Sequence, residues 1–278
     1  MNAPGRIARL ICVEAMKVLG GRMLKFGLLA VLAVTALTAW AHEPIDQETG
    51  WTLFSAALSA GLWAAEIFVL VAGTTTIAGE TAQGTLKMIL PHAYRRSDWI
   101  VAKAMVLLAQ AVVLLAVATI TALLFAKAGP GLTDVTQKDE LTLDGTPKLL
   151  VVRTAVEMSG FARDTIYVSL ASLVATAWVG LLISCVFDGV VAALSTGFLL
   201  FLGVKSAGTL FGASPDLLRR VYATYPGEMS HLVEKLGRGF AERWPVDLAS
   251  SGVWLAVGTG VAAVALGAWR FARRDLQS

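Results

Sequence analysis

The chain has 278 residues, of which 56% are hydrophobic and 15% are charged, and its formal net charge is +3. An ordinary soluble domain is excluded, because soluble domains carry about 25% charged residues and this chain has a mean hydropathy of +0.68. The apolar residues form blocks of about 20 or more, the length that a helix needs to cross a bilayer. We therefore expect an all-α membrane protein with one domain over residues 1–278.

The first element, residues 1–22, has an amphipathic helical pattern. One face carries the apolar residues and another the cations, namely Ile7, Ile11, Ala15, Val18 and Leu19 against Arg6, Arg9 and Lys17. Such a helix lies on a membrane surface with its cations near anionic headgroups. No convincing small-residue cleavage site follows, so we expect the first apolar block to be retained as a span.

Six apolar blocks follow, and each is long enough to be a transmembrane helix. They cover residues 24–41, 54–78, 99–127, 165–187, 190–210 and 252–271. Only Asp188 and Gly189 separate the fourth block from the fifth. We interpret them as a tight hairpin, because about 45 apolar residues are too many for a single crossing.

Lysine and arginine residues indicate the orientation of the bundle. They gather in the N-terminal segment, in the loop 79–98 and in the C-terminal tail, whereas the loop after the first span has none. By the positive-inside rule, both termini and the loop 79–98 face the cytoplasm. The sequence thus predicts a multi-pass protein of a bacterial cytoplasmic (inner) membrane.

Two longer segments, residues 128–163 and 212–250, would then be extracytoplasmic. Within the first, residues 148–157 predict a short helix or strand. The second mixes apolar and charged residues at helical spacing. It predicts two short amphipathic helices before the last span, which lie at the outer interface or dip back into the bundle.

The loop 79–98 has features of a short helix between two turns. Glu80 can cap the positive end of a helix over residues 84–90. Gly84 permits a sharp turn, and Pro91 ends the helix. The loop also exposes apolar side chains and an arginine pair to a partner, namely Leu86, Met88, Ile89, Leu90, Arg95 and Arg96. The simpler alternative is a solvated turn with a positive-inside cluster.

Glu80, Gly84-Thr85-Leu86, Pro91, Arg95-Arg96 and Lys103, together with the six-span plan, resemble the type-2 family of ATP-binding-cassette (ABC) permeases. The resemblance implies a transport subunit of an exporter that is not itself an enzyme. Its cytoplasmic coupling helix would contact two ATPase subunits, which would bind ATP and magnesium. A second permease copy, in a homodimer, would complete the pathway, and membrane lipid would surround it.

The coupling residues that the resemblance implies are carried over one by one. They are Glu80, Gly84, Thr85, Leu86, Met88, Leu90, Pro91, Arg95 and Arg96. Gly79 and Gly84 have the glycine spacing of a phosphate-binding loop, but the next residues are Thr85 and Leu86 instead of a lysine. We therefore expect no cofactor on this chain, no catalytic residue and no nucleic-acid partner.

Glu66 is the one acid near the middle of a predicted span. Such a carboxylate faces a partner group or a wet cavity, so it either lines the translocation pathway or hydrogen-bonds to a neighbouring helix in its protonated form. Lys205, in the fifth span, is expected to snorkel for structural reasons. Glu228, His231 and Glu234 share a helical face, which we interpret as solvated and not as a metal site.

Small residues recur every four positions in two predicted spans and predict close helix packing. They are Gly252, Ala256 and Gly260 in the last span and Ser172 and Thr176 in the fourth. Two other functions stay open. The chain could belong to an ABC-like assembly that acts mechanically on periplasmic partners, or to an ATP-independent secondary transporter with Glu66 as its coupling group.

Overall fold

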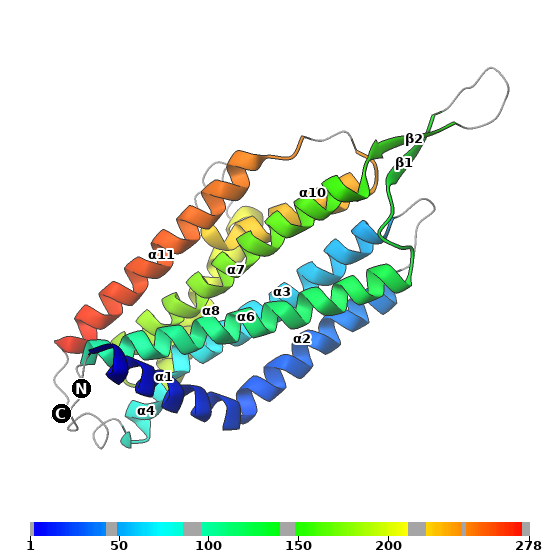
Figure 1. Ribbon diagram of the computed structural model, residues 1–278. Coiled ribbons are helices and arrows are strands. Elements are labelled where there is room, and N and C mark those ends of the chain that lie inside the picture. The colour runs from blue at the N-terminus through cyan, green and yellow to red at the C-terminus, as the bar shows by residue number, and fades with distance from the viewer. Residues whose placement is uncertain are drawn as a thin grey trace.

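The computed structural model describes residues 3–42, 49–85, 96–139, 148–210, 221–240 and 243–273. These residues form an elongated bundle of helices (Figure 1). Five described helices are long and apolar enough to cross a membrane, which supports a multi-pass all-α membrane protein. They are α2 (Arg22–Ala41), α3 (Gly50–Thr75), α6 (Arg96–Ala128), α7 (Ala155–Val186) and α11 (Val246–Ala272).

The other elements are shorter or lie at the edges of the bundle. They are α1 (Ala3–Gly20), α4 (Ala78–Ala82), α8 (Val190–Leu210), η1 (Tyr222–Thr224), α10 (Tyr225–Gly237) and the strands β1 (Val135–Asp139) and β2 (Lys148–Arg153). The start of α1 and the end of α11 lie at one end of the bundle, and the β1–β2 hairpin extends from the other (Figure 1). Among the described residues, the apolar part of α8 covers Val190–Ser206, and a sixth crossing stays a prediction.

The helix α7 starts at Ala155, well before the predicted boundary near residue 165. A capping box explains the difference, since the Glu157 amide donates to Thr154 Oγ1 and the Thr154 amide donates to a Glu157 carboxylate oxygen. These paired bonds satisfy amides that a helix start otherwise leaves open. The predicted helix or strand at 148–157 is therefore a strand followed by the first turn of α7.

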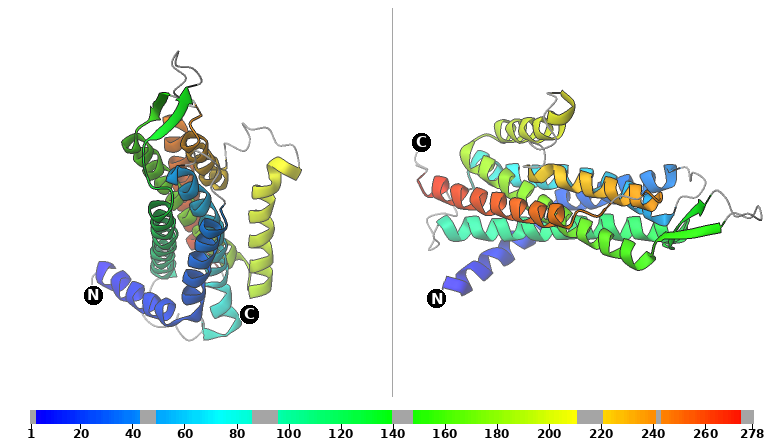
Figure 2. Two further views of the ribbon diagram at one scale, coloured as in Figure 1. Left: turned by 90° about the vertical axis from the view of Figure 1, so that its right-hand side faces the viewer. Right: turned by 90° about the horizontal axis from the view of Figure 1, so that it is seen from above.

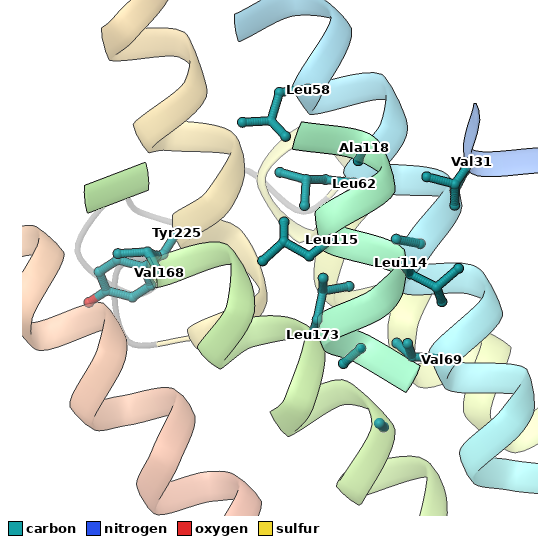
Figure 3. Packing of buried hydrophobic residues seen from close by; sticks show 14 of the residues in the cluster. Val31, Leu58, Leu62, Val69, Leu114, Leu115, Ala118, Val168, Leu173 and Tyr225 are labelled. Carbon is teal, nitrogen blue, oxygen red and sulfur yellow. The ribbon is translucent and has the colours of Figure 1, made fainter. Parts of the chain in front are cut away.

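The centre of the bundle is formed by α3, α6 and α7. Figure 3 shows how Leu62 of α3, Leu115 of α6 and Leu173 of α7 pack together, and each is at most 4% exposed. The backbones of α3 and α7 lie close together where Gly73 faces Gly180. A Cβ atom on Gly180 would lie 3.1 Å from the Gly73 Cα, and one on Gly73 would collide with the Ala177 carbonyl oxygen, so Gly73 must be glycine.

The predicted close packing of the last span is confirmed. A Cβ atom on Gly252 would lie 2.6 Å from Tyr225 Cδ1, and one on Gly260 would lie 2.8 Å from Trp178 Cε3. Ala256 between them is 1% exposed. The small residues of α11 therefore allow η1, α10 and α7 to approach.

The helix α10 packs inside the bundle against α3 and α7, which favours the dipping alternative for this segment. Met229, Val233 and Leu236 are fully buried. At its far end, the Thr49 hydroxyl donates to the Gly237 carbonyl over 3.0 Å. The chain thus returns from α10 to the end of the bundle where α3 begins.

The helix α1 buries two residues that lie outside its predicted apolar face. Leu19 is 64% exposed, whereas Leu10 and Glu14 are 7% and 6% exposed. The helix packs against α6, and it does so through the side that carries Leu10 and Glu14. Glu14 faces the bundle because Lys103 lies there and forms an ion pair with it. Hydropathy alone does not predict such a pair.

Candidate functional site

Four charged side chains from three helices meet at the end of the bundle where α3 ends and α6 begins. Lys103 of α6 lies 2.9 Å from Glu14 Oε2 of α1 and 3.0 Å from Glu80 Oε1 of α4. Lys17 of α1 lies 2.8 Å from Glu14 Oε1 and 3.2 Å from Glu80 Oε1. We call these four residues the end cluster, and its formal charges cancel.

The helices place the four side chains by simple spacing. Glu14 and Lys17 are three residues apart on α1 and so share a face. Lys103 points inward from α6, where its side chain is 2% exposed. Its ammonium also donates to the Thr76 carbonyl at the end of α3 over 3.4 Å and lies 4.3 Å from the centre of the Trp99 ring.

A second contact fixes the start of α4 to α7. The backbone amides of Ile77 and Ala78 donate to Ser184 Oγ over 2.9 Å and 2.8 Å. Ser184 is fully buried, so this hydroxyl satisfies two amides that α4 itself leaves without carbonyl partners. The segment that carries Glu80 is therefore held by α1, α6 and α7.

The charges of α1 are stabilised in their ionised forms. Burial raises the pKa of Glu14, but Lys103 and Lys17 outweigh it, so the pKa is lower than usual. Burial lowers the pKa of Lys17, but Glu14 and Glu80 outweigh it, so that pKa is higher than usual. The ion pairs of α1 thus persist on both sides of neutral pH.

A cavity of about 220 Å³ adjoins the end cluster. All four charged residues line it, together with Gln110 and residues at the ends of α1 and α3. Both polar and apolar side chains line it, and they come from α1, α2, α3, α4 and α6 and the turns between them.

The structure places three of the predicted coupling residues just after α3. Glu80 lies in the first turn of α4, which ends at Ala82, and its carboxylate binds Lys17 and Lys103. Gly84 has a φ of +69°, a conformation that favours glycine. Thr85 Oγ1 donates to the Glu80 carbonyl over 3.1 Å.

The predicted helix over residues 84–90 lies largely outside the described residues, as do Leu86, Met88, Leu90, Pro91 and Arg95. Arg96 is described and binds within the chain. Its guanidinium donates to the Phe271 and Ala272 carbonyls over 3.4 Å and 3.3 Å. It thus caps the end of α11, and the start of α6 and the end of α11 are joined.

A second charged group lies in the interior of the bundle. Glu66 of α3 is 2% exposed, and the Lys205 ammonium of α8 lies 3.1 Å from its Oε1 and 2.8 Å from its Oε2. Trp63 and Phe201 flank the ammonium at 5.2 Å and 5.6 Å from their ring centres. The expectation that Lys205 snorkels is therefore wrong, because it turns inward to a carboxylate.

Sequence reasoning named Glu66 and Lys205 separately but missed their pairing. It also missed Glu14 and gave Lys17 only a role near headgroups. A usable signal was present, since Glu66 and Lys205 have opposite charges within the second and fifth predicted spans, and unpaired charges in a membrane are costly.

One acidic residue of α10 contacts two basic side chains. Glu234 lies 2.8 Å from Arg238 and 3.7 Å from His231. Within the described residues, no group of three or more His, Cys, Asp or Glu side chains is placed to hold a metal ion. No family model matches the chain, and no curated protein matches it either.

Proposed function

We propose that this chain is the membrane-spanning permease subunit of an ABC exporter. ATP hydrolysis in separate ATPase subunits would drive translocation of a substrate through it. One observation carries the proposal: Glu80, which opens the predicted coupling loop, is bound by ion pairs to α1 and α6. A solvated turn has no need of such anchorage.

The anchorage suits the transmission of force. An ATPase that moves the loop 79–98 would move α4, and the ion pairs of about 3 Å would carry that movement to Lys103 and Glu14. The amide bonds to Ser184 would carry it to α7. A packed bundle shifts between discrete arrangements, and the ATPase supplies free energy through its different affinities for the two.

The same arrangement fits the proposed orientation. With both termini in the cytoplasm of a bacterial cell, α1 would lie along the inner leaflet of the cytoplasmic membrane. Val13, Met16 and Leu19 of α1 are 46%, 60% and 64% exposed, and they would insert among the lipid chains. A second copy of the chain would complete the pathway as a homodimer.

Nucleotide and magnesium would bind to the ATPase subunits. In this chain Gly79 lies inside α4 and the helix α3 precedes it, whereas a phosphate-binding loop follows a strand and ends in Gly-Lys. The segment around Gly84 is accordingly proposed as a contact for the ATPase surface and not for ATP itself.

Purification of the tagged chain from its native membrane tests the proposal. We expect a protein with a nucleotide-binding loop to copurify, and the double variant L86D/L90D to lose it because two carboxylates would replace the apolar contacts. The control variant V156D changes a residue that is 80% exposed at the opposite end of the bundle and should retain the ATPase. Absence of an ATPase from the unmodified complex would overturn the proposal.

The alternative function, mechanical action on periplasmic partners, has one observation in its favour. The β1–β2 hairpin extends beyond the helices at the end opposite to the end cluster (Figure 1). Replacing residues 135–153 by a short glycine-serine linker would separate the two functions. The exporter predicts retained ATP-driven transport, and the mechanical assembly predicts a retained ATPase complex without activity.

A further inference from the structure

A second cavity, of about 250 Å³, lies among α3, α7, α8, α11 and η1. Its walls are mostly apolar. The helix α7 contributes Val179 and Ile183, and α8 contributes Leu200, Phe201 and Val204. This cavity shares no lining residue with the cavity beside the end cluster.

The cavity extends from the middle of the bundle towards the end where α3 and α7 end. Thr176 and Thr259 line it near the middle of α7 and α11, and Leu70 and Ile183 line it nearer the ends of α3 and α7. All four residues belong to helices long enough to cross a membrane. The surroundings of the cavity are therefore the hydrocarbon interior of a bilayer. Water is scarce at that depth, whereas hydrocarbon chains are abundant.

The cavity is accessible from the side of the bundle. Leu200 lines it and is nevertheless 53% exposed, and the adjacent Leu199 on α8 is 73% exposed. Figure 2 shows that α8 stands at the side of the bundle in both views. A molecule in the bilayer can thus enter past α8 without passing through water.

The cavity is almost entirely apolar, and Tyr222 of η1 brings a hydroxyl-bearing side chain to its lining. Phe201 lines the same space and lies 5.6 Å from the Lys205 ammonium. Since Lys205 and Glu66 neutralise each other, this ion pair brings no net charge to the cavity.

We propose that this cavity binds an amphipathic, lipid-like molecule with an uncharged polar group. The hydrocarbon chain would fill the apolar cavity, and the polar group would bond to the Tyr222 hydroxyl. An apolar cavity of about 150 Å³ is enough for benzene, so this cavity has space for a longer hydrocarbon segment. The identification of this molecule as a substrate of the exporter rests on the proposed function, whereas the existence of the binding site does not.

The test uses the purified full-length chain and a diazirine-bearing monoacylglycerol, which has one chain and an uncharged head. After photolysis, we expect saturable labelling of peptides that contain residues 176–183 or 197–204. In the variant L200W an indole ring occupies the space of the chain. Loss of about two buried methylene groups corresponds to roughly tenfold weaker binding.

The matched control is L199W, which adds the same ring to the next residue on the outer side of α8. Its labelling should equal that of the unmodified chain. A second cavity variant, V204F, should weaken labelling as L200W does, which guards against a folding defect. Y222F should weaken labelling by the monoacylglycerol but leave labelling by a diazirine alkane without a head group unchanged.

Labelling that does not saturate, or that L200W and L199W change equally, would overturn the proposal. So would tighter labelling by a diazirine fatty acid with a charged carboxylate than by the monoacylglycerol at the same concentration. If the site labels as expected but no ATPase copurifies, the proposed function fails alone. If an ATPase copurifies and labelling fails, only the ligand class is wrong.

Discussion

The ammonium of Lys103 lies 3.0 Å from the Glu80 carboxylate and 2.9 Å from that of Glu14. This single buried lysine therefore joins the segment after α3 to the amphipathic helix α1. The segment after α3 is therefore held by an ion pair at Glu80, unlike a solvated turn. The proposed coupling of an external ATPase to the membrane helices depends on this anchorage.

Removal of the Lys103 charge should strongly destabilise the chain. In K103M, Glu14 loses its buried partner, and breaking a buried ion pair costs about 3–5 kcal/mol. Lys17 makes similar contacts but its side chain is 44% exposed, so K17M should cost no more than about 1 kcal/mol. Denaturant unfolding in detergent measures both, and equal losses would contradict the central role of Lys103.

Acid should weaken the attachment of α1. The pKa of Glu14 lies below its ordinary value of 4.5 because Lys103 and Lys17 outweigh the effect of burial. A lowered carboxyl pKa stabilises the fold above the ordinary value, and this stabilisation is lost as the pH falls through the lower, folded value. The unfolding free energy should therefore decline below pH 4.5, and E14Q should show a shallower decline. An unchanged acid slope in E14Q would exclude Glu14 as its source.

The contact between α3 and α7 should not tolerate a side chain at Gly73. A Cβ atom there would collide with the Ala177 carbonyl, and such overpacking costs about 1–3 kcal/mol. The control is G160A on α7, where no atom lies within 4 Å of the added Cβ. Alanine favours a helix over glycine, so G160A should be neutral or stabilising in the same unfolding assay. Similar losses in G73A and G160A would refute the close approach.

The interior ion pair should show strong coupling between its two members. Either E66L or K205M alone leaves a charge in the bundle without its partner, at a cost of about 3–5 kcal/mol. The double variant removes both charges and should recover most of that loss. A double-mutant cycle on the unfolding free energy gives the coupling directly, and additive losses would show that the pair does not form.

Hydropathy predicted the helices well because a membrane helix must be apolar throughout its length. It placed α8 and the ends of α6 within a few residues. It missed the first turns of α7, where Arg163 and Asp164 interrupt the apolar pattern but the Thr154 capping box starts the helix. Hydropathy identifies the residues that can contact lipid, whereas a capping motif identifies the residue at which a helix begins.

The candidate site was less accessible to sequence reasoning. Glu80 was predicted from local spacing, but its partners were not, because Lys17 and Lys103 are 63 and 23 residues away from it. Trp51 and Trp99 look like interfacial aromatics near span ends, yet each is only 3% exposed. Trp51 donates to the Thr133 carbonyl, and Trp99 stacks on Phe271. Such pairings depend on how helices are arranged in space, which local patterns do not encode.

Site-specific photocrosslinking would detect contact between the segment after α4 and an ATPase subunit. A photoreactive amino acid would replace Gln83, an exposed residue directly after α4, and in a matched sample Val156 at the opposite end. We expect an ATP-dependent crosslink from position 83 to an ATPase subunit in native membranes and none from position 156. A crosslink from position 156 alone, or none from position 83 in membranes that contain the ATPase, would contradict the proposed contact.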